Sequence, residues 1–126
     1  MIENFGIGID ISNVEKFANK PFETNESFYK GIFTEQEIDY CLKFTNYPEK
    51  FAGKFALKEA LMKSINETII FLEIETSYLN SKPTVTILNS KQNDHISAAE
   101  SKYRFLASLS HENGIAVAVI ISEKIT

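Results

Sequence analysis

Hydrophobic and polar residues alternate along Phe5–Ile11 with the period of a β-strand. One face of this stretch is entirely apolar, whereas the opposite face carries Gly6, Gly8 and Asp10. A glycine within a strand often marks a place where another backbone or a ligand comes close. The pattern therefore predicts a strand whose bare face ends at a carboxylate. The alternative is that Asp10 caps the following helix through its side-chain oxygen.

A second pattern, over Phe51–Ile65, predicts a long helix, because it is rich in helix formers and has no proline. At about 100° per residue, Lys54 and Lys58 project from the edge of an apolar arc, where they could also snorkel. Glu59 and Lys63 share another face with three alanines, so a backbone or a ligand could come close to the acid. A carboxylate among lysines suits an anionic substrate held with a metal ion. The alternative is an ordinary surface pair of Glu59 and Lys63, worth about 0.2–0.5 kcal/mol.

Shorter helices are predicted over residues 13–19 and 26–31. A third begins at Thr34, because Thr34 and Glu37 have the spacing of a capping box. Pro48 disfavours a helical Tyr47, so we expect a break between this helix and the long one. The polar stretch 94–102 predicts a further helix.

Four more strands are predicted, over residues 68–76, 84–88, 104–110 and 115–122. Asn113-Gly114 joins the last two and is typical of a tight hairpin turn, since both residues tolerate positive φ. The nearly continuous apolar run of the last strand predicts that both of its faces are covered. The order of elements predicts an α+β fold with a mostly antiparallel sheet packed against one long helix.

The composition bounds the class of protein. With 126 residues, 44% apolar and 24% charged, we expect residues 1–126 to form one globular domain. We expect no membrane segment, because no apolar run approaches the ~20 residues of a span. The single cysteine, Cys41, rules out an intrachain disulfide and weakly favours the cytoplasm. The net charge of −4 argues against a nucleic-acid partner, whereas the lysines of the long helix indicate a small anionic ligand or an acidic partner surface.

Three stretches, in this order and at these separations, resemble motifs of the phosphopantetheinyl transferase family. They are GIGID at residues 6–10, KEA-x-x-K at residues 58–63 and SLSH at residues 108–111. The likeness is closest to the small holo-acyl-carrier-protein synthase branch. It extends to FT-x-x-E-x-x-YC from Phe33, to FAG-K-FA from Phe51, and to AVAVI at residues 116–120. The resemblance implies a 4′-phosphopantetheinyl transferase-like fold.

The activity that this resemblance implies is transfer of 4′-phosphopantetheine from coenzyme A to a serine of an apo acyl carrier protein. The other product is adenosine 3′,5′-bisphosphate. Asp10 and Glu59 would be the protein ligands of a Mg²⁺ ion, and Lys63 would complete the catalytic set. The implied coenzyme A contacts are Lys54, Lys58, Lys63, Pro83, Ser110 and His111. The residue chemistry agrees, since Mg²⁺ is commonly held by one or two carboxylates plus substrate phosphates. For the general base, Glu59 and a metal-bound water both stay open.

The resemblance also implies partners. The branch is trimeric, with the serine-histidine pair supplied by a neighbouring subunit, so a homotrimer is expected. Carrier proteins are acidic, and Lys16 on the first helix, with Lys20 nearby, would steer them. The alternatives are that Lys16 is an ordinary solvated lysine and that His111 is a satisfied turn residue.

The chain departs from the family pattern in two places. The family usually follows its second lysine with a Gly-Thr-Gly loop, whereas Ser64–Thr68 contains no glycine and adds the negative charge of Glu67. Asn13 stands where a glutamate is usual. The first departure motivates an alternative function, in which a catalytically impaired homologue binds a carrier protein or a nucleotide without transfer. A third possibility is an unrelated α+β binding module.

Overall fold

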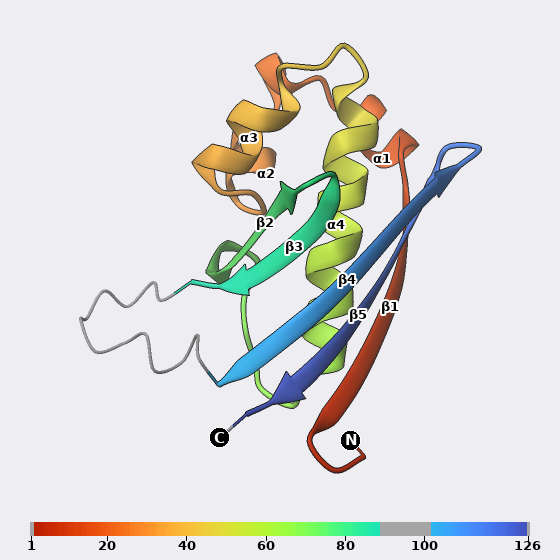
Figure 1. Cartoon of the computed structure of the whole chain (residues 1–126). Helices are drawn as coiled ribbons and strands as arrows, with labels where there is room; N and C mark the ends of the chain where they lie inside the picture. The colour runs from red at the N-terminus through yellow and green to blue at the C-terminus, as the bar shows by residue number, and fades with distance from the viewer. Residues whose placement is uncertain (1, 89–101, 126) are drawn as a thin grey trace.

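A computed structural model of the chain describes residues 2–88 and 102–125. Its larger sheet has the strand order β1-β5-β4, formed by β1 (Phe5–Asn13), β5 (Ile115–Lys124) and β4 (Tyr103–Glu112), and all neighbours are antiparallel. A separate antiparallel hairpin consists of β2 (Ile74–Leu79) and β3 (Lys82–Ile87). Figure 1 shows the long helix α4 (Tyr47–Ser64) lying along the larger sheet. The predicted α+β class is confirmed, while the helix predicted over 94–102 falls, except for Lys102, outside the described residues.

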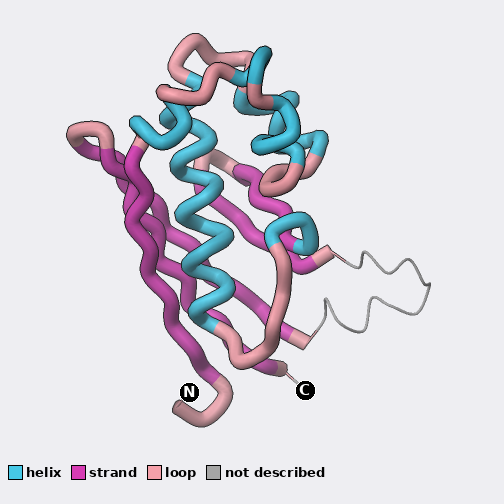
Figure 2. Tube along the Cα trace, turned by 180° about the vertical axis from the view of Figure 1, so that it is seen from behind, coloured by secondary structure: helices cyan, strands magenta, loops and turns pink. Residues whose placement is uncertain are grey.

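The helix α4 is buried on almost every side. The sheet covers one flank, and three short helices gather around its N-terminal half, as the reverse view shows (Figure 2). They are α1 (Glu15–Ala18), α2 (Glu26–Lys30) and α3 (Glu35–Cys41). The expected break between α3 and α4 is confirmed at residues 42–46, but it does not extend to Pro48, since α4 already includes Tyr47. Proline is tolerated in the first turn, where its missing N–H would have no helical partner and its φ already suits the helix.

Aromatic side chains pack the short helices against α4. The ring of Phe51 lies 4.6 Å from that of Tyr29 and 4.7 Å from that of Phe33, measured between centroids. The Tyr29 hydroxyl donates to the carbonyl of Lys20 at 2.7 Å, so its polar end is satisfied inside the core. Burial raises the pKa of Tyr29 to about 12. These contacts fix the N-terminal region against one end of α4.

The glycine face of β1 packs directly on α4. A Cβ atom placed on Gly8 would lie 1.9 Å from the Ala60 carbonyl oxygen, a separation that no side chain can occupy. At the same end, the Ser122 hydroxyl donates to the Ser64 carbonyl at 2.7 Å. The prediction of a close backbone approach at this strand is confirmed at Gly8. The small residues on both elements therefore bring β1 and the C-terminal half of α4 into contact.

The shorter elements agree with the sequence in part. The capping box of Thr34 and Glu37 is confirmed, and so is the hairpin turn, where Asn113 and Gly114 have φ of 52° and 77°. The strand predicted over 68–76 begins only at Ile74, because residues 71–73 form the 3₁₀ turn η2 (Phe71–Glu73). The Glu73 carboxylate accepts a hydrogen bond from the Ile70 N–H and stabilises that turn. A second 3₁₀ turn, η1 (Phe22–Thr24), precedes α2.

The outer face of the larger sheet is apolar and open in the single chain. The expectation that both faces of the last strand are covered is wrong there, since only its helix-facing residues are buried. We call this surface the apolar sheet face; its most exposed members, at 39% to 70%, are Phe5, Ile7, Ile9, Ile11, Leu106 and Ile121. A contiguous apolar surface of this kind commonly marks an interaction site. Within the described residues, no helix has both the length and the apolar character needed to cross a membrane.

Candidate functional site

Asp10, Glu59 and Lys63 come together between β1 and α4. Asp10 lies on the helix-facing side of β1, and its Oδ1 is 3.1 Å from the Lys63 Nζ. The same ammonium group donates to the Ile9 carbonyl at 3.1 Å. Glu59 lies one helical turn before Lys63, on the same face. We call these three residues the Asp10–Glu59–Lys63 cluster.

The two structural alternatives, a helix cap at Asp10 and a surface pair of Glu59 and Lys63, do not describe the structure. The residue that precedes α1 is Val14, and no side chain caps that helix, so Asp10 is not a cap. Lys63 forms its ion pair with Asp10 of the strand and not with Glu59 of the same helix. The Glu59 carboxylate, which is half-buried, has no ion-pair or hydrogen-bond partner among the described residues. A free acid therefore lies beside a paired one.

Among the described residues, the cluster can supply two carboxylates to a metal ion but no third histidine, cysteine or acidic side chain. No group of three or more histidine, cysteine, aspartate or glutamate side chains within residues 2–88 and 102–125 could hold a metal. Zinc and calcium sites usually need more protein ligands than this. Mg²⁺ keeps several waters and accepts substrate phosphates as ligands. The donor set of Asp10 and Glu59 therefore fits Mg²⁺ with water and phosphate oxygens completing the shell.

Lys16 of α1 lies next to the cluster, whereas Lys20 follows α1. The Lys16 Nζ is 3.9 Å from the centroid of the Phe55 ring, and Phe55 is one turn before Glu59 on the same face of α4. The Lys20 Nζ is 5.2 Å from the Phe28 ring. Both lysines are exposed to solvent, and Lys16 is the one that contacts α4, the helix that carries two of the cluster residues.

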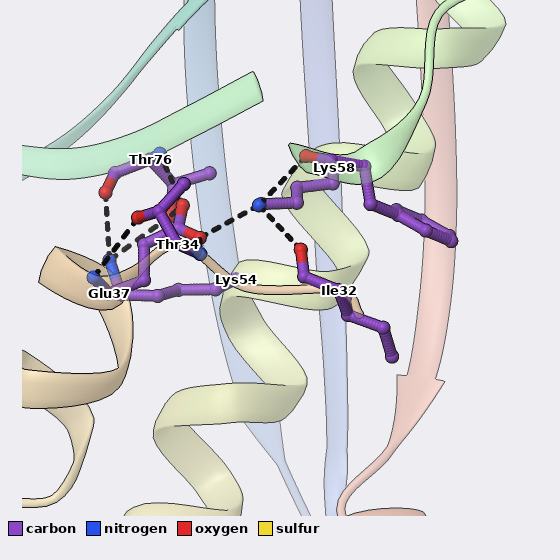
Figure 3. Close-up of polar contacts among 7 residues, drawn as sticks. Ile32, Thr34, Glu37, Lys54, Lys58 and Thr76 are labelled. Carbon is purple, nitrogen blue, oxygen red and sulfur yellow. Dashed lines mark hydrogen bonds and ion pairs between the residues drawn. The ribbon is translucent and has the colours of Figure 1, made fainter. Parts of the chain in front are cut away.

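Lys58 does not face the site, and its predicted contact with coenzyme A is corrected. Its side chain is 0% exposed, and its Nζ lies 2.7 Å from Glu37 Oε1. It also donates to the carbonyls of Ile32 and Phe71 at 2.8 and 3.0 Å, so all three of its N–H groups have partners (Figure 3). Burial lowers the pKa of Lys58, while the Glu37 carboxylate acts in the opposite direction.

The Glu37 carboxylate is the centre of this buried network. It accepts the Thr34 N–H at 2.8 Å on one oxygen, and the N–H and hydroxyl of Thr76 at 2.6 and 2.8 Å on the other. Thr34 precedes α3 and Thr76 belongs to β2, so one carboxylate joins α3, α4 and the hairpin. We call Glu37, Lys58, Thr34 and Thr76 the Glu37 network.

Lys54 is likewise structural, and its predicted phosphate contact is also corrected. Its Nζ donates to the carbonyl and the hydroxyl of Thr76 at 3.0 and 3.1 Å, and its side chain is buried. The rings of Tyr40 and Tyr78 flank the ammonium at 4.9 and 5.3 Å. Burial lowers the pKa of Lys54. The basic character that the sequence suggested for this helix is therefore largely internal.

The remaining predicted residues lie apart from the cluster within one chain. His111 is at the far end of β4, where its Nε2 is 3.3 Å from the Glu49 carbonyl and its ring lies over Gly53. That position is about 15 Å along the helix from Lys63, at the usual rise per residue. Ser110 points to the opposite face of the sheet, toward the apolar sheet face. Pro83 lies on the β2–β3 hairpin, paired with Tyr78.

Comparisons with known proteins agree on one family. A sequence profile described as the 4′-phosphopantetheinyl transferase superfamily matches residues 6–120. A holo-[acyl-carrier-protein] synthase from Caldicellulosiruptor saccharolyticus is 36% identical over 124 residues, covering 95% of this chain and 97% of the relative.

Two solved structures extend the similarity to the fold. A holo-(acyl-carrier-protein) synthase from Bacillus anthracis, in complex with CoA (3′,5′-ADP), has a TM-score of 0.71 at 28% identity, covering 95% of this chain and 96% of that one. The holo-[acyl-carrier-protein] synthase of Helicobacter pylori, in complex with coenzyme A, has a TM-score of 0.72 at 28% identity, with coverage of 93% and 99%.

Proposed function

Since the chain belongs to the 4′-phosphopantetheinyl transferase superfamily, and to its holo-acyl-carrier-protein synthase type, we propose that the Asp10–Glu59–Lys63 cluster is its reaction centre. The substrates are coenzyme A and an apo acyl carrier protein, and residues 1–126 act as one transferase domain. The observation that carries this proposal is the placement of Asp10 against Lys63, with Glu59, which has no partner among the described residues, one turn away.

The reaction joins the serine Oγ of the carrier protein to the β-phosphorus of coenzyme A. The bond between that phosphorus and the bridging oxygen breaks, and adenosine 3′,5′-bisphosphate leaves with the bond's electron pair. The serine proton passes to a base, either Glu59 or a water molecule. Such transfers depend chiefly on positioning and on stabilising negative charge. The Lys63 ammonium supplies positive charge where the pyrophosphate would lie.

Asp10 and Glu59 would hold Mg²⁺, which when bound offsets the charge of the pyrophosphate. The side chain of Asp10 is mostly buried, and β1 is rigidly packed at Gly8, so this carboxylate has a fixed position. Lys63 is more exposed and can contact a phosphate without leaving the cluster. The Ile9 carbonyl accepts a hydrogen bond from the Lys63 ammonium group and keeps it close to Asp10.

A homotrimer accounts for two further observations. The apolar sheet face is open in one chain, and a second copy of the same face could cover it. Ser110 and His111 lie away from the cluster of their own chain, so they would act on coenzyme A only across an interface. Pro83 is proposed as a further contact of the nucleotide.

Lys16 and Lys20 are proposed to receive the carrier protein. Both side chains are exposed, and Lys16 lies over Phe55, one helical turn before Glu59, so positive charge there would steer an acidic partner toward Glu59. A cytoplasmic location stays a prediction from the sequence.

The direct experiment is to incubate the protein with apo acyl carrier protein, coenzyme A and Mg²⁺ and to measure the mass of the carrier protein by mass spectrometry. We expect a mass gain equal to phosphopantetheine. Asp10→Ala and Glu59→Ala should each abolish this gain while the circular dichroism spectrum is unchanged. If several carriers bind but none gains mass, the protein is instead a binding homologue without transfer.

A further inference from the structure

A hollow lies where α4 ends beside the start of β1, on the Lys63 side of the cluster. Its volume is about 490 Å³, and it is lined by Ile2, Phe5, Gly6, Ile7, Lys63, Ser64, Asn66 and Ile121. At this end the hollow is lined by Ser64, the last residue of α4, and by Asn66 of the segment that follows it. We call Ser64–Thr68 the post-helix segment. It stands where the family usually has its glycine-rich loop.

The backbone of the post-helix segment offers free donors. The amide N–H groups of Asn66, Glu67 and Thr68 donate to no acceptor in the described part of the chain. Successive free amides next to an ammonium group form a favourable environment for phosphate. Lys63 supplies that ammonium group at the same end of the helix. The segment can therefore approach an anion through its backbone, although it has no glycine.

The side chain of Glu67 is turned away from this hollow. Its Oε2 accepts the hydroxyl proton of Tyr103 at 2.8 Å and lies 3.5 Å from the Lys102 Nζ. Tyr103 is only 6% exposed, and its ring stacks on Phe105, so the hydroxyl is a fixed donor at the start of β4. The hydrogen bond from Tyr103 lowers the pKa of Glu67, with Lys102 acting in the same direction. The charge that seemed unfavourable for phosphate is therefore tied to β4.

We infer that the Glu67–Tyr103 hydrogen bond is a positioning device that takes the place of the missing glycine loop. It holds the post-helix segment with its amide groups toward the phosphates of coenzyme A. It also keeps the Glu67 carboxylate from facing those phosphates. Neither residue touches the reacting atoms, so their effect falls on coenzyme A affinity. The choice of coenzyme A as ligand rests on the proposed function.

Two substitutions separate the hydrogen bond from the charge. Tyr103→Phe breaks the hydrogen bond and leaves the carboxylate free, whereas Glu67→Gln removes the charge and keeps an acceptor oxygen for Tyr103. Coenzyme A affinity is measured by titration calorimetry, and KM and kcat are measured with a carrier protein. Tyr103→Phe should weaken coenzyme A binding about tenfold, as for one lost hydrogen bond to a charged group. Glu67→Gln should bind at least as well as the unaltered protein.

A third variant guards against misfolding. Glu67 is exposed, so Glu67→Ala should fold even if Tyr103→Phe does not. It loses the hydrogen bond and should bind coenzyme A more weakly than Glu67→Gln. In all variants kcat and the KM for the carrier should stay within about twofold of the unaltered protein, since a purely structural defect would lower kcat as well. Tyr40→Phe, a half-buried tyrosine on α3, is the matched control and should change nothing.

Equal coenzyme A affinity of Glu67→Ala and Glu67→Gln would overturn the inference, as would a fall in kcat without a change in affinity. The outcome for the proposed function is separate. If the unaltered protein transfers phosphopantetheine but the variants all bind alike, only this inference fails. If it binds coenzyme A with the expected ranking but transfers nothing, only the proposed function fails.

Discussion

Replacing Lys58 by methionine tests whether the Glu37 network stabilises the fold. The substitution keeps most of the side-chain volume but removes an ammonium group that is 0% exposed and lies 2.7 Å from Glu37 Oε1. The Glu37 carboxylate would stay buried without its counter-charge, and the carbonyls of Ile32 and Phe71 would lose a donor. Removing one partner of a buried ion pair typically costs about 3–5 kcal/mol. That is a large part of the ~5–15 kcal/mol that stabilises a domain.

The assay is urea denaturation followed by circular dichroism at one fixed protein concentration, because any oligomer would make stability depend on concentration. We expect Lys58→Met to lower the free energy of unfolding by about 3–5 kcal/mol. Lys30→Met is the matched control, since Lys30 forms an exposed pair with Glu26; it should change stability by no more than about 0.5 kcal/mol.

A double variant identifies the cause of the loss. Glu37→Gln combined with Lys58→Met removes both charges of this ion pair, so no carboxylate is left buried without its counter-charge. The double variant should therefore be more stable than Lys58→Met alone, although it lacks two charged groups. Additive effects of the two substitutions, within about 0.5 kcal/mol, would refute the reasoning. So would a Lys58→Met protein as stable as the Lys30→Met control.

Three further outcomes follow from other parts of the structure. Gly8→Ala should destabilise the protein by about 3 kcal/mol or more in urea, because the added methyl meets the Ala60 carbonyl; native-like stability would contradict the packing. Burial raises the pKa of Cys41 to about 12 in the folded protein, above its unfolded value of ~8.5. The stability that this buried thiol contributes is therefore fully present below about pH 8.5. Above that pH, the free energy of unfolding falls by about 1.4 kcal/mol per pH unit. Cys41→Ala should therefore lose less stability than the unaltered protein between about pH 9 and 11, whereas parallel curves would refute the assignment. Ile9→Lys, on the apolar sheet face, should reduce the mass in sedimentation equilibrium, while the similarly exposed Ile70→Lys should not; an unchanged mass for both would refute the apolar sheet face as the trimer interface.

Much of the fold could be predicted from the sequence, because it depends on residues that are close together in the chain. The alternation along β1, the capping box at Thr34 and the Asn113-Gly114 turn each depend on residues near one another in sequence. The close approach of β1 to α4 was also predictable, since glycine on one element and alanine on the other leave room for it. The placement of Asp10 against Lys63 follows from that approach.

Other features depend on partners far away in the chain or outside it. The capping box showed one role of Glu37, but its pairing with Lys58 and Thr76 arises only when three elements meet. Spacing alone could not distinguish a lysine at the edge of an apolar arc from one inside it. The last strand's apolar run suggested two covered faces, whereas one chain covers only one of them. Glu67 looked unfavourable because its donor, Tyr103, lies far along the sequence.

The measurement that tests the central claim most directly is the binding of Mn²⁺, as a spectroscopic substitute for Mg²⁺, in the presence of coenzyme A. Electron paramagnetic resonance should show one bound ion per chain in the unaltered protein. Asp10→Asn and Glu59→Gln should each lose this ion, and Glu35→Gln, on the exposed surface of α3, should keep it. Undiminished Mn²⁺ binding by either of the first two variants would contradict a shared metal site at Asp10 and Glu59.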